Sequence, residues 1–401
     1  MAMLVLGIIF GAVAGEAATS IDWIGTLFIR LIRMIVVPLV FITLVAGVVA
    51  MGDPKKLGSL GIKTMALYMG TTLFAITIGL TFAAIIQPGV GVDLAGTTAS
   101  TLPQSTMTLE ERLLSIIPTN PVQALTEANM LAIIFFALIL GAGILVAGEK
   151  GKAVGKVFES GSDVMLKITH MVMEVAPFGV FSLISGVVGT GGISKLLDVL
   201  PLVICFMSAC LIQVIFTYGA IMKFMLKLPP VRFFKGITGA QLVAFSTSSS
   251  SGSLPMTMTV AEENLGVSKT VASSVLPLGA TINMDGSALY VGILAVFAAQ
   301  VFGVPMGLAE YALIAFAATI ASIGVAAVPS ASLFMLAAVM DVLNIDGAQT
   351  AIIVGFIFPF DRPLDMIRTV VNVSGDLTVS TAVAKWEGEL DEETFKAEPV
   401  D

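Results

Sequence analysis

Long apolar runs constrain this chain more than any other feature of its sequence. The clearest lie at Ile21–Met51, Thr64–Ile86 and Leu196–Leu226, and a helix of about 20 such residues crosses the hydrocarbon core of a bilayer. Charged residues make up 12% of the chain, whereas soluble domains carry about 25%. The runs lack the alternation of outer-membrane strands. The sequence therefore predicts an all-α polytopic membrane protein.

The distribution of basic residues predicts how these runs cross the membrane. Lysine and arginine collect in alternate loops, which places those loops in the cytoplasm. Lys235 and Lys269 then lie on the same side, so the chain between them enters and returns, with the serine-rich stretch 246–255 at its tip. A second such segment has 322–330 at its tip. We predict eight transmembrane helices and two re-entrant helical hairpins that enter from opposite sides, an arrangement typical of inverted repeats.

The last third of the chain carries ionisable residues inside apolar runs. One predicted helical face holds five polar residues at spacings i, i+3, i+4, i+7 and i+11, namely Asp365, Arg368, Thr369, Asn372 and Asp376. The stretch Ala280–Ser287 adds Asn283 and Asp285. A charge at the bilayer centre costs about 2.5 to 3.5 kcal/mol, so these groups are expected to pair or to coordinate ions.

The residue types indicate which ligands such a site would take. Carboxylate and amide oxygens suit a hard cation, Arg368 offers a planar fork for a carboxylate, and Asp365 can pair with an ammonium group. Three competing interpretations remain at this point. In the first, Asp365 and Arg368 form a structural ion pair that merely holds the bundle together. In the second, Asp285 with Gly286 forms a helix-breaking turn, and in the third, Tyr68, Thr71 and Thr72 only pack between helices.

Four motifs in this order resemble the glutamate transporter family of sodium-coupled amino acid and dicarboxylate symporters. They are TSSSSGSLP, LPLGATINMDGSALY, SIGVAAVP and LDMIRTVVNVSGD, the last followed by VAKWEGELD. The resemblance covers essentially the whole chain. It implies the glutamate transporter fold, a homotrimer in the lipid bilayer, and a multi-pass protein of the plasma (inner) membrane with a cytoplasmic C-terminus.

The resemblance also assigns roles to matching positions. It implies a substrate site formed by Ser249, Ser250, Ser251, Ser287, Val328, Asp365, Arg368, Thr369 and Asn372. It implies sodium ions at three sites: Asp376, Asn283 and Asn372 with the Gly279 carbonyl; Thr281 with the backbone of Ser322, Ile323 and Val325; and Tyr68, Thr71 and Thr72 with Asn283 and Asp285.

By the same resemblance, residues 1–57 and 89–195 form a scaffold. Residues 58–88 and 196–388 form a transport domain that slides across the membrane as an elevator, and residues 389–401 form an acidic cytoplasmic tail. The second hairpin is the implied outer gate.

The sequence also departs from the family pattern. Family members often carry an arginine just before the serine triplet or beside Asp365, where this chain has Ser248 and Met366. Arg362 lies one turn before Asp365 and is predicted to take over the contact. Hairpin 2 has Ala327 and Ser330 where glycines are common.

The predicted function is sodium-coupled symport of an acidic amino acid, L-aspartate or L-glutamate. Asp365 would repel a pure dicarboxylate, and a neutral amino acid has no use for Arg368. The alternative is a proton-coupled or C4-dicarboxylate symporter of the same family. An intramembrane hydrolase would need a base, and the polar stretches contain no histidine and place no lysine near the serine run. An enzyme and a nucleic-acid-binding protein are therefore not expected.

Overall fold

Helices form almost all of the described part of the chain. The computed structural model describes residues 2–50, 54–92, 94, 114, 116–322, 330–345 and 347–399. Within these ranges there is no strand, only an isolated bridge between Val267 and Leu390. Four helices there, or five if a bent pair counts as one span, are long and apolar enough to cross a membrane. The prediction of an all-α membrane protein is confirmed.

The first part of the chain forms one group of packed helices. Its members are α1 (Ala2–Ala14), α2 (Asp22–Ala50), α5 (Pro121–Glu127), α6 (Met130–Val146), α7 (Lys152–Glu174) and α8 (Ala176–Gly191). Helix α2 packs against α6, α7 and α8, and α1 packs against α8. At about 1.5 Å per residue, α1 is too short to span a bilayer alone. It continues into α2 through the 3-10 turns of η1 (Gly15–Ile21).

Two connections in this group are irregular. Helices α7 and α8 meet at a bend of 48°. Pro177 lies in the first turn of α8, where its missing N–H costs no hydrogen bond. Helices α5 and α6 are separated by Ala128 and Asn129. Asn120 and Asn129 cap these two helices with their side chains.

A second group packs around the most buried helix of the protein. This helix is α14 (Asp285–Val301), whose residues 285–299 are all buried. It lies against α3 (Pro54–Ile86), α9 (Leu200–Ile212) and α17 (Gly347–Glu387). The 3-10 turns of η3 (Ile193–Val199) lead into α9. The π-helical turns η4 (Gln213–Tyr218) and η5 (Ile221–Met225) follow it. Helix α13 (Lys269–Ile282) ends just before α14, so this apolar stretch is broken at Asn283 and Met284.

Two helix pairs complete the second group. Helices α11 (Thr238–Thr247) and α12 (Ser250–Glu263) pack on each other and on α17, and they are joined at Ser248 and Ser249, within the predicted serine-rich tip. Helices α15 (Leu308–Ser322) and α16 (Ala331–Val342) pack on each other and on α14. The predicted tip residues Ile323, Val325 and Val328 lie outside the described residues.

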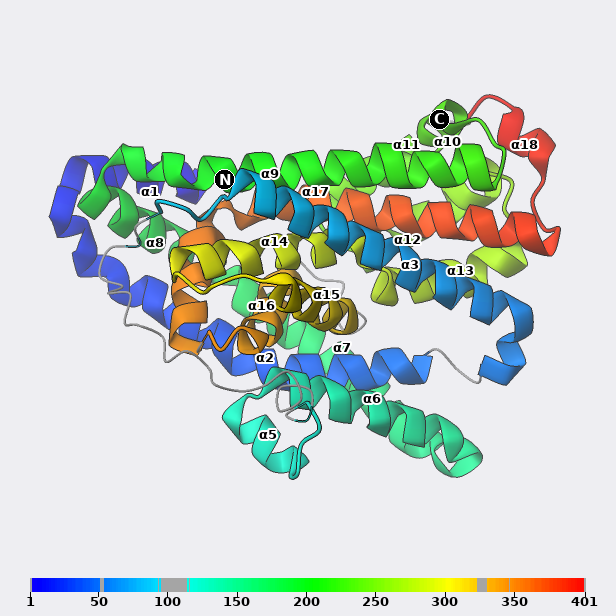
Figure 1. Ribbon diagram of the computed structural model, residues 1–401, viewed down its shortest axis with the longest axis horizontal. Helices are drawn as coiled ribbons and strands as arrows, with labels where there is room; N and C mark the ends of the chain where they lie inside the picture. The colour runs from blue at the N-terminus through cyan, green and yellow to red at the C-terminus, as the bar shows by residue number, and fades with distance from the viewer. Residues whose placement is uncertain are drawn as a thin grey trace.

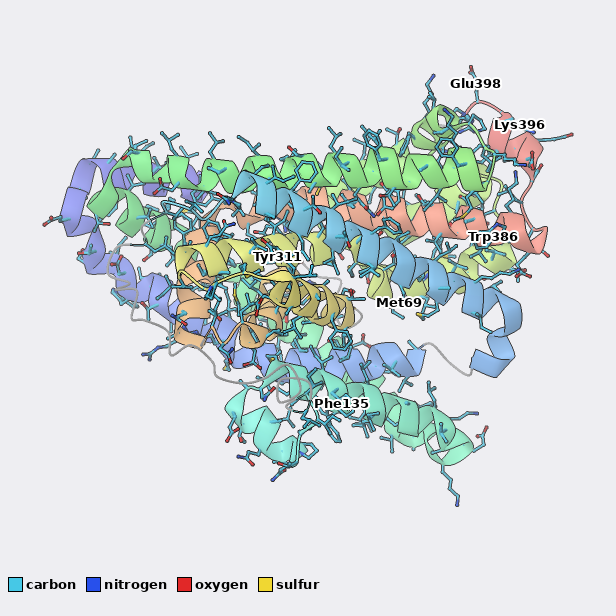
Figure 2. The ribbon with its side chains drawn as sticks, viewed as in Figure 1. Met69, Phe135, Tyr311, Trp386, Lys396 and Glu398 are labelled. Atoms are coloured by element: carbon cyan, nitrogen blue, oxygen red, sulfur yellow. The ribbon has the colours of Figure 1, made fainter. Side chains whose placement is uncertain are left out.

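Two short helices lie in space beside the C-terminus. They are α10 (Pro230–Gly236), from the middle of the chain, and α18 (Glu392–Lys396). Figure 1 shows both at the end of the molecule where α17 finishes, away from α1 and α8. Trp386, Lys396 and Glu398 lie at this same end (Figure 2). A third short helix, η2 (Gly148–Lys150), joins α6 to α7.

Candidate functional site

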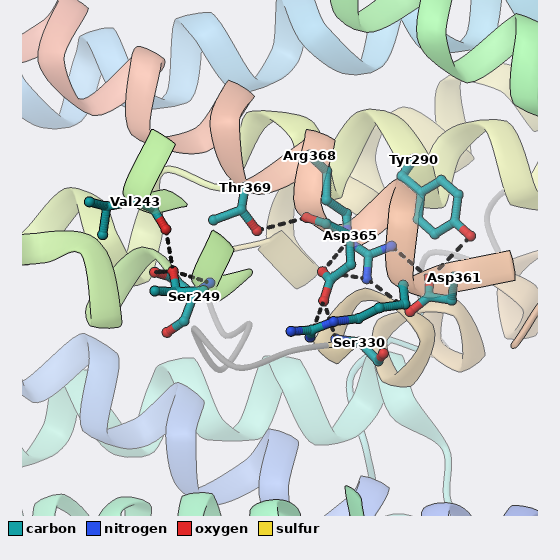
Figure 3. A network of polar contacts seen from close by, with 10 residues as sticks. Val243, Ser249, Tyr290, Ser330, Asp361, Asp365, Arg368 and Thr369 are labelled. Atoms are coloured by element: carbon teal, nitrogen blue, oxygen red, sulfur yellow. Dashed lines mark hydrogen bonds and ion pairs between the residues drawn. The ribbon is translucent and has the colours of Figure 1, made fainter. Parts of the chain in front are cut away.

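A buried cluster of charged residues lies on one face of α17. Arg368 is 1% exposed and forms ion pairs with Asp361 at 2.9 Å and with Asp365 at 2.7 Å. The Tyr290 ring of α14 lies under the guanidinium, 4.7 Å from ring centroid to the central carbon, and its hydroxyl donates to Asp361 at 3.3 Å. Figure 3 shows these side chains converging. All the nitrogens of the Arg368 guanidinium are therefore used within the protein.

Asp365 connects this cluster to the second helix pair. Its Oδ1 accepts from Arg368, while its Oδ2 accepts the backbone N–H of Ser330 at 2.9 Å. Ser330 lies at the start of α16 with a positive φ of 62°. The Arg362 guanidinium lies 3.8 Å from the same Oδ2 and is 45% exposed. Arg362 is thus a looser partner of Asp365 than Arg368 is.

The serine turn between α11 and α12 approaches the cluster from the Thr369 side (Figure 3). Ser249 caps α12 by accepting the N–H of Gly252 at 3.0 Å, and Ser250 is buried. Ser248 has a positive φ of 52°, and its buried hydroxyl has no hydrogen-bond partner among the described residues. Ser251 is exposed. The turn therefore buries Ser248 and Ser250, leaves Ser249 half-buried and leaves Ser251 exposed.

A second buried carboxylate lies where α13 gives way to α14. Asp285 accepts hydrogen bonds from Thr72 at 2.7 Å and Tyr218 at 2.7 Å, with longer contacts from Thr71 and Gln213 at 3.4 Å. All four donors are neutral. Thr71 and Thr72 come from α3, as the sequence predicts, while Gln213 and Tyr218 come from the π-helical turns after α9. Such turns recur at functional sites.

The third carboxylate, Asp376, is linked to the same region. The Asn283 amide donates to Asp376 at 3.0 Å and its oxygen accepts from Thr71 at 3.2 Å. The Asn372 oxygen accepts the N–H of Gly286 at 2.8 Å and so caps the start of α14. A Cβ on Gly286 would lie 2.3 Å from the Arg368 carbonyl oxygen. Only glycine therefore allows α14 to begin this close to α17.

Some predicted ligands are adjacent to this network and others are not. Tyr68 donates to the Val275 carbonyl, and its hydroxyl lies against Gly279 beside Asp376. Ser287 accepts from Asn372 at 3.4 Å. In contrast, the hydroxyls of Thr281 and Ser322 bond to carbonyls within their own helices. The described residues thus bring together the predicted ligands of two sodium sites, whereas Ile323 and Val325 of the second predicted site lie outside the described residues.

Sequence reasoning missed four residues of this site: Asp361, Tyr290, Gln213 and Tyr218. Asp361 lies seven residues before Arg368 on the same helical face, a spacing that could have identified it. Gln213 is a lone amide in an apolar run, which is the only sequence signal it offers. Tyr290 and Tyr218 offered no signal, because an aromatic residue in such a run is ordinarily core.

The chemistry of the network suits a hard cation or a proton. In the part of the chain that the structure describes, no three His, Cys, Asp or Glu residues gather. Asp285 and Asp376 are both buried, and hydroxyl and amide groups surround them. A buried carboxylate is costly unless its charge is neutralised. The donor set therefore suits an ion held by oxygen atoms, or a proton.

An all-helical chain with membrane-length apolar helices thus encloses a charged site built where helices are broken. Broken helices that meet around buried polar groups at membrane depth define the class of secondary transporters. The chain belongs to the sodium:dicarboxylate symporter family, whose model matches residues 1–386. The predicted resemblance is confirmed, and the family consists of transporters rather than enzymes.

Curated relatives match over nearly their full length. The chain is 36% identical to the proton/sodium-glutamate symport protein of Geobacillus stearothermophilus, covering 98% of this chain and 94% of the relative. It is 35% identical to the proton/glutamate-aspartate symporter of Escherichia coli, covering 97% and 92%. It is 31% identical to the C4-dicarboxylate transport protein of Leptothrix cholodnii, covering 98% and 88%.

Proposed function

We propose that this protein is a symporter that moves L-aspartate or L-glutamate across the membrane together with sodium. The observation that carries the substrate assignment is the buried arginine between two acids. An acidic amino acid presents a carboxylate to Arg368 and an ammonium group to Asp365. The ion pair between Arg368 and Asp365 is then replaced by two ion pairs with the substrate. A neutral amino acid could pair its ammonium group with Asp365, but it has no side-chain carboxylate for Arg368.

Sodium coupling is supported by the two other buried acids. Asp285 and Asp376 receive hydrogen bonds from neutral groups, so a cation would offset both burial and mutual repulsion. Sodium is a hard cation that suits carboxylate, amide and hydroxyl oxygens. Relatives are named for proton and for sodium coupling, which makes the proton the alternative ion.

The family membership also supports a finer architecture. We propose eight spans and two re-entrant hairpins, α11–α12 and α15–α16, with a cytoplasmic C-terminus and a homotrimeric assembly. The helix groups are consistent with a scaffold (residues 1–57 and 89–195) and a moving transport domain (residues 58–88 and 196–388), because most packing lies within each group. Alternating access would then be an elevator motion, with α15–α16 as the outer gate.

Uptake into liposomes tests the function directly. Purified protein is reconstituted, and labelled aspartate and glutamate are followed with an inward sodium gradient, with an inward proton gradient, and with neither. Sodium-driven accumulation of either amino acid is expected. Uptake driven equally well by protons without sodium would replace the proposed ion, and failure of both amino acids to enter would overturn the substrate.

C4-dicarboxylates are the second candidate substrates, and Arg362 is the observation that favours them. Its guanidinium lies near Asp365, so the repulsion between Asp365 and a dicarboxylate is partly screened. Succinate is aspartate without its ammonium group, so its binding would depend on Arg362 as the remaining countercharge.

The variant Arg362→Gln separates these two substrates. We expect succinate to compete about tenfold more weakly for the site, which corresponds to about 1.4 kcal/mol, while aspartate affinity changes less than about threefold because its own ammonium offsets Asp365. Competition binding in detergent measures both, with Arg362→Lys as the charge-conserving control. A parallel loss of both ligands would contradict this role for Arg362.

A further inference from the structure

The chain folds back on itself after α17. Gly388, with a positive φ of 74°, reverses its direction, and residues 388–399 then cross the base of the α11–α12 pair. We call this segment the C-terminal strap. Helix α18 of the strap lies beside α10 at the end of the molecule opposite α1 (Figure 1).

Backbone hydrogen bonds join the strap to the connection between α12 and α13. Ser268 N–H donates to the Glu389 carbonyl at 3.0 Å, and Asp391 N–H donates to the Gly266 carbonyl at 2.8 Å. They flank the bridge between Val267 and Leu390. Gly266 has a positive φ of 67°, and a Cβ there would lie 2.3 Å from the Asp391 carbonyl oxygen. The strap therefore requires glycine at this position.

Side chains fasten the strap to α10 and to the end of α12. Phe395 is fully buried, and the Arg232 guanidinium carbon lies 5.9 Å from its ring centroid. Arg232 also donates to the carbonyls of Ala397 and Asn264, and the Asn264 amide donates to the Gly236 carbonyl at 3.1 Å. Arg232 thus links the strap, α10 and α12 through one side chain.

Charged groups of the strap also hold it to the end of α17. Glu392 pairs with Lys385 of α17 at 3.0 Å and with Lys396 at 2.9 Å. Hydrogen bonds from Lys396 and Lys385 lower the pKa of Glu392, and those from Thr394 and the backbone lower the pKa of Asp391. A lowered folded-state pKa adds stability at neutral pH that is lost only as the pH falls through it. Of these contacts, only the Glu392–Lys385 pair joins the strap to α17, because the groups that lower the pKa of Asp391 and the Lys396 partner of Glu392 all lie within the strap.

The far end of the same helix pair reaches the substrate site. Gln241 of α11 donates to the Ser374 hydroxyl of α17 at 2.9 Å, and Ser248 to Ser250 form the turn beyond it. Since α12 is about 20 Å long, a small rotation at its base displaces the turn by a larger distance. We propose that Phe395 and Arg232 are positioning residues, which fix the base of the α11–α12 pair against α17 and thereby hold the serine turn at the site.

Two strap variants and one matched control test this proposal. Phe395→Ala removes the buried anchor, Arg232→Gln is a milder change that keeps it, and Lys396→Gln alters an exposed residue of the same helix whose ion pair with Glu392 lies within the strap. Hydrogen–deuterium exchange is followed in residues 244–254 and, for reference, in residues 288–299 of α14. Isothermal titration gives the aspartate Kd, and thermal unfolding reports the fold.

We expect Phe395→Ala to speed hydrogen exchange at the serine turn at least about tenfold and to raise the aspartate Kd about tenfold. Arg232→Gln should have intermediate effects on both measurements, and Lys396→Gln should match the wild type. Exchange in α14 should not change. Lower thermal stability with unaltered exchange at the turn and unaltered Kd would overturn the positioning role. The affinity measurement depends on the proposed function, whereas exchange does not. If the wild type bound no aspartate, the function would fail and exchange would still decide on the strap.

Discussion

Replacement of Arg368 by alanine is expected to abolish high-affinity binding of aspartate and glutamate, with a loss of at least about 100-fold. The side-chain carboxylate of an acidic substrate would lose a planar, two-pronged donor in a fully buried position. Charge-assisted hydrogen bonds contribute about 1.5 to 3 kcal/mol each, and 100-fold corresponds to about 2.7 kcal/mol. Titration of the purified variant with both amino acids measures the change.

Asparagine is the ligand that separates a binding role from a structural one. It matches aspartate in shape and lacks only the side-chain charge, so any weak binding of asparagine should survive in Arg368→Ala. The variant leaves Asp361 and Asp365 without their buried countercharge, which itself can cost about 3 to 5 kcal/mol of stability. The double variant Asp361→Asn with Arg368→Ala removes one of these charges and keeps the test valid if the single variant is unstable. Equal loss of aspartate and asparagine in both variants would contradict the assigned role.

The polar face of α17 could be predicted because helical periodicity is a local property. Asp365, Arg368 and Asp376 lie on one helix at the predicted spacings, and all are buried. Asp361 was not predicted as a partner, although it pairs with Arg368. Pro363 lies between them without ending α17, so the polar face continues across a residue type that ordinarily ends or kinks a helix.

Partners from distant elements could not be predicted in this way. Tyr290 stacks on Arg368, and Tyr218 donates to Asp285, because α14 packs against α9 and α17. In a sequence both tyrosines are indistinguishable from core aromatics. The same limit applies to the strap, since a short acidic segment after a long helix resembles a solvated tail. Only its packing against Arg232 and Gly266 distinguishes it.

The contacts around Arg368 favour a role in substrate binding over a purely structural ion pair with Asp365. The structure contains the ion pair, as a purely structural role would require. However, Asp361 already offers Arg368 a carboxylate on the other side, and Asp365 has two further partners in Ser330 and Arg362. A substrate can thus displace one contact of each residue while the rest hold both in place. This redundancy is what an exchangeable site needs, and a purely structural pair does not need it.

The second large effect is expected for Asp285→Asn, which should raise the sodium concentration needed for half-maximal aspartate binding at least about 100-fold. Asparagine keeps the shape and one acceptor oxygen for Thr72 or Tyr218, so the variant removes the charge more than the packing. Aspartate binding titrated at fixed pH over a range of sodium concentrations measures this shift. Asp163→Asn, at an exposed position of α7, serves as the control and should match the wild type.

An unchanged sodium dependence would show that Asp285 does not hold the coupling ion. If instead binding in the variant lost a dependence on pH, the buried carboxylate would be the proton carrier, because its neutral donors can stabilise either a bound cation or a bound proton.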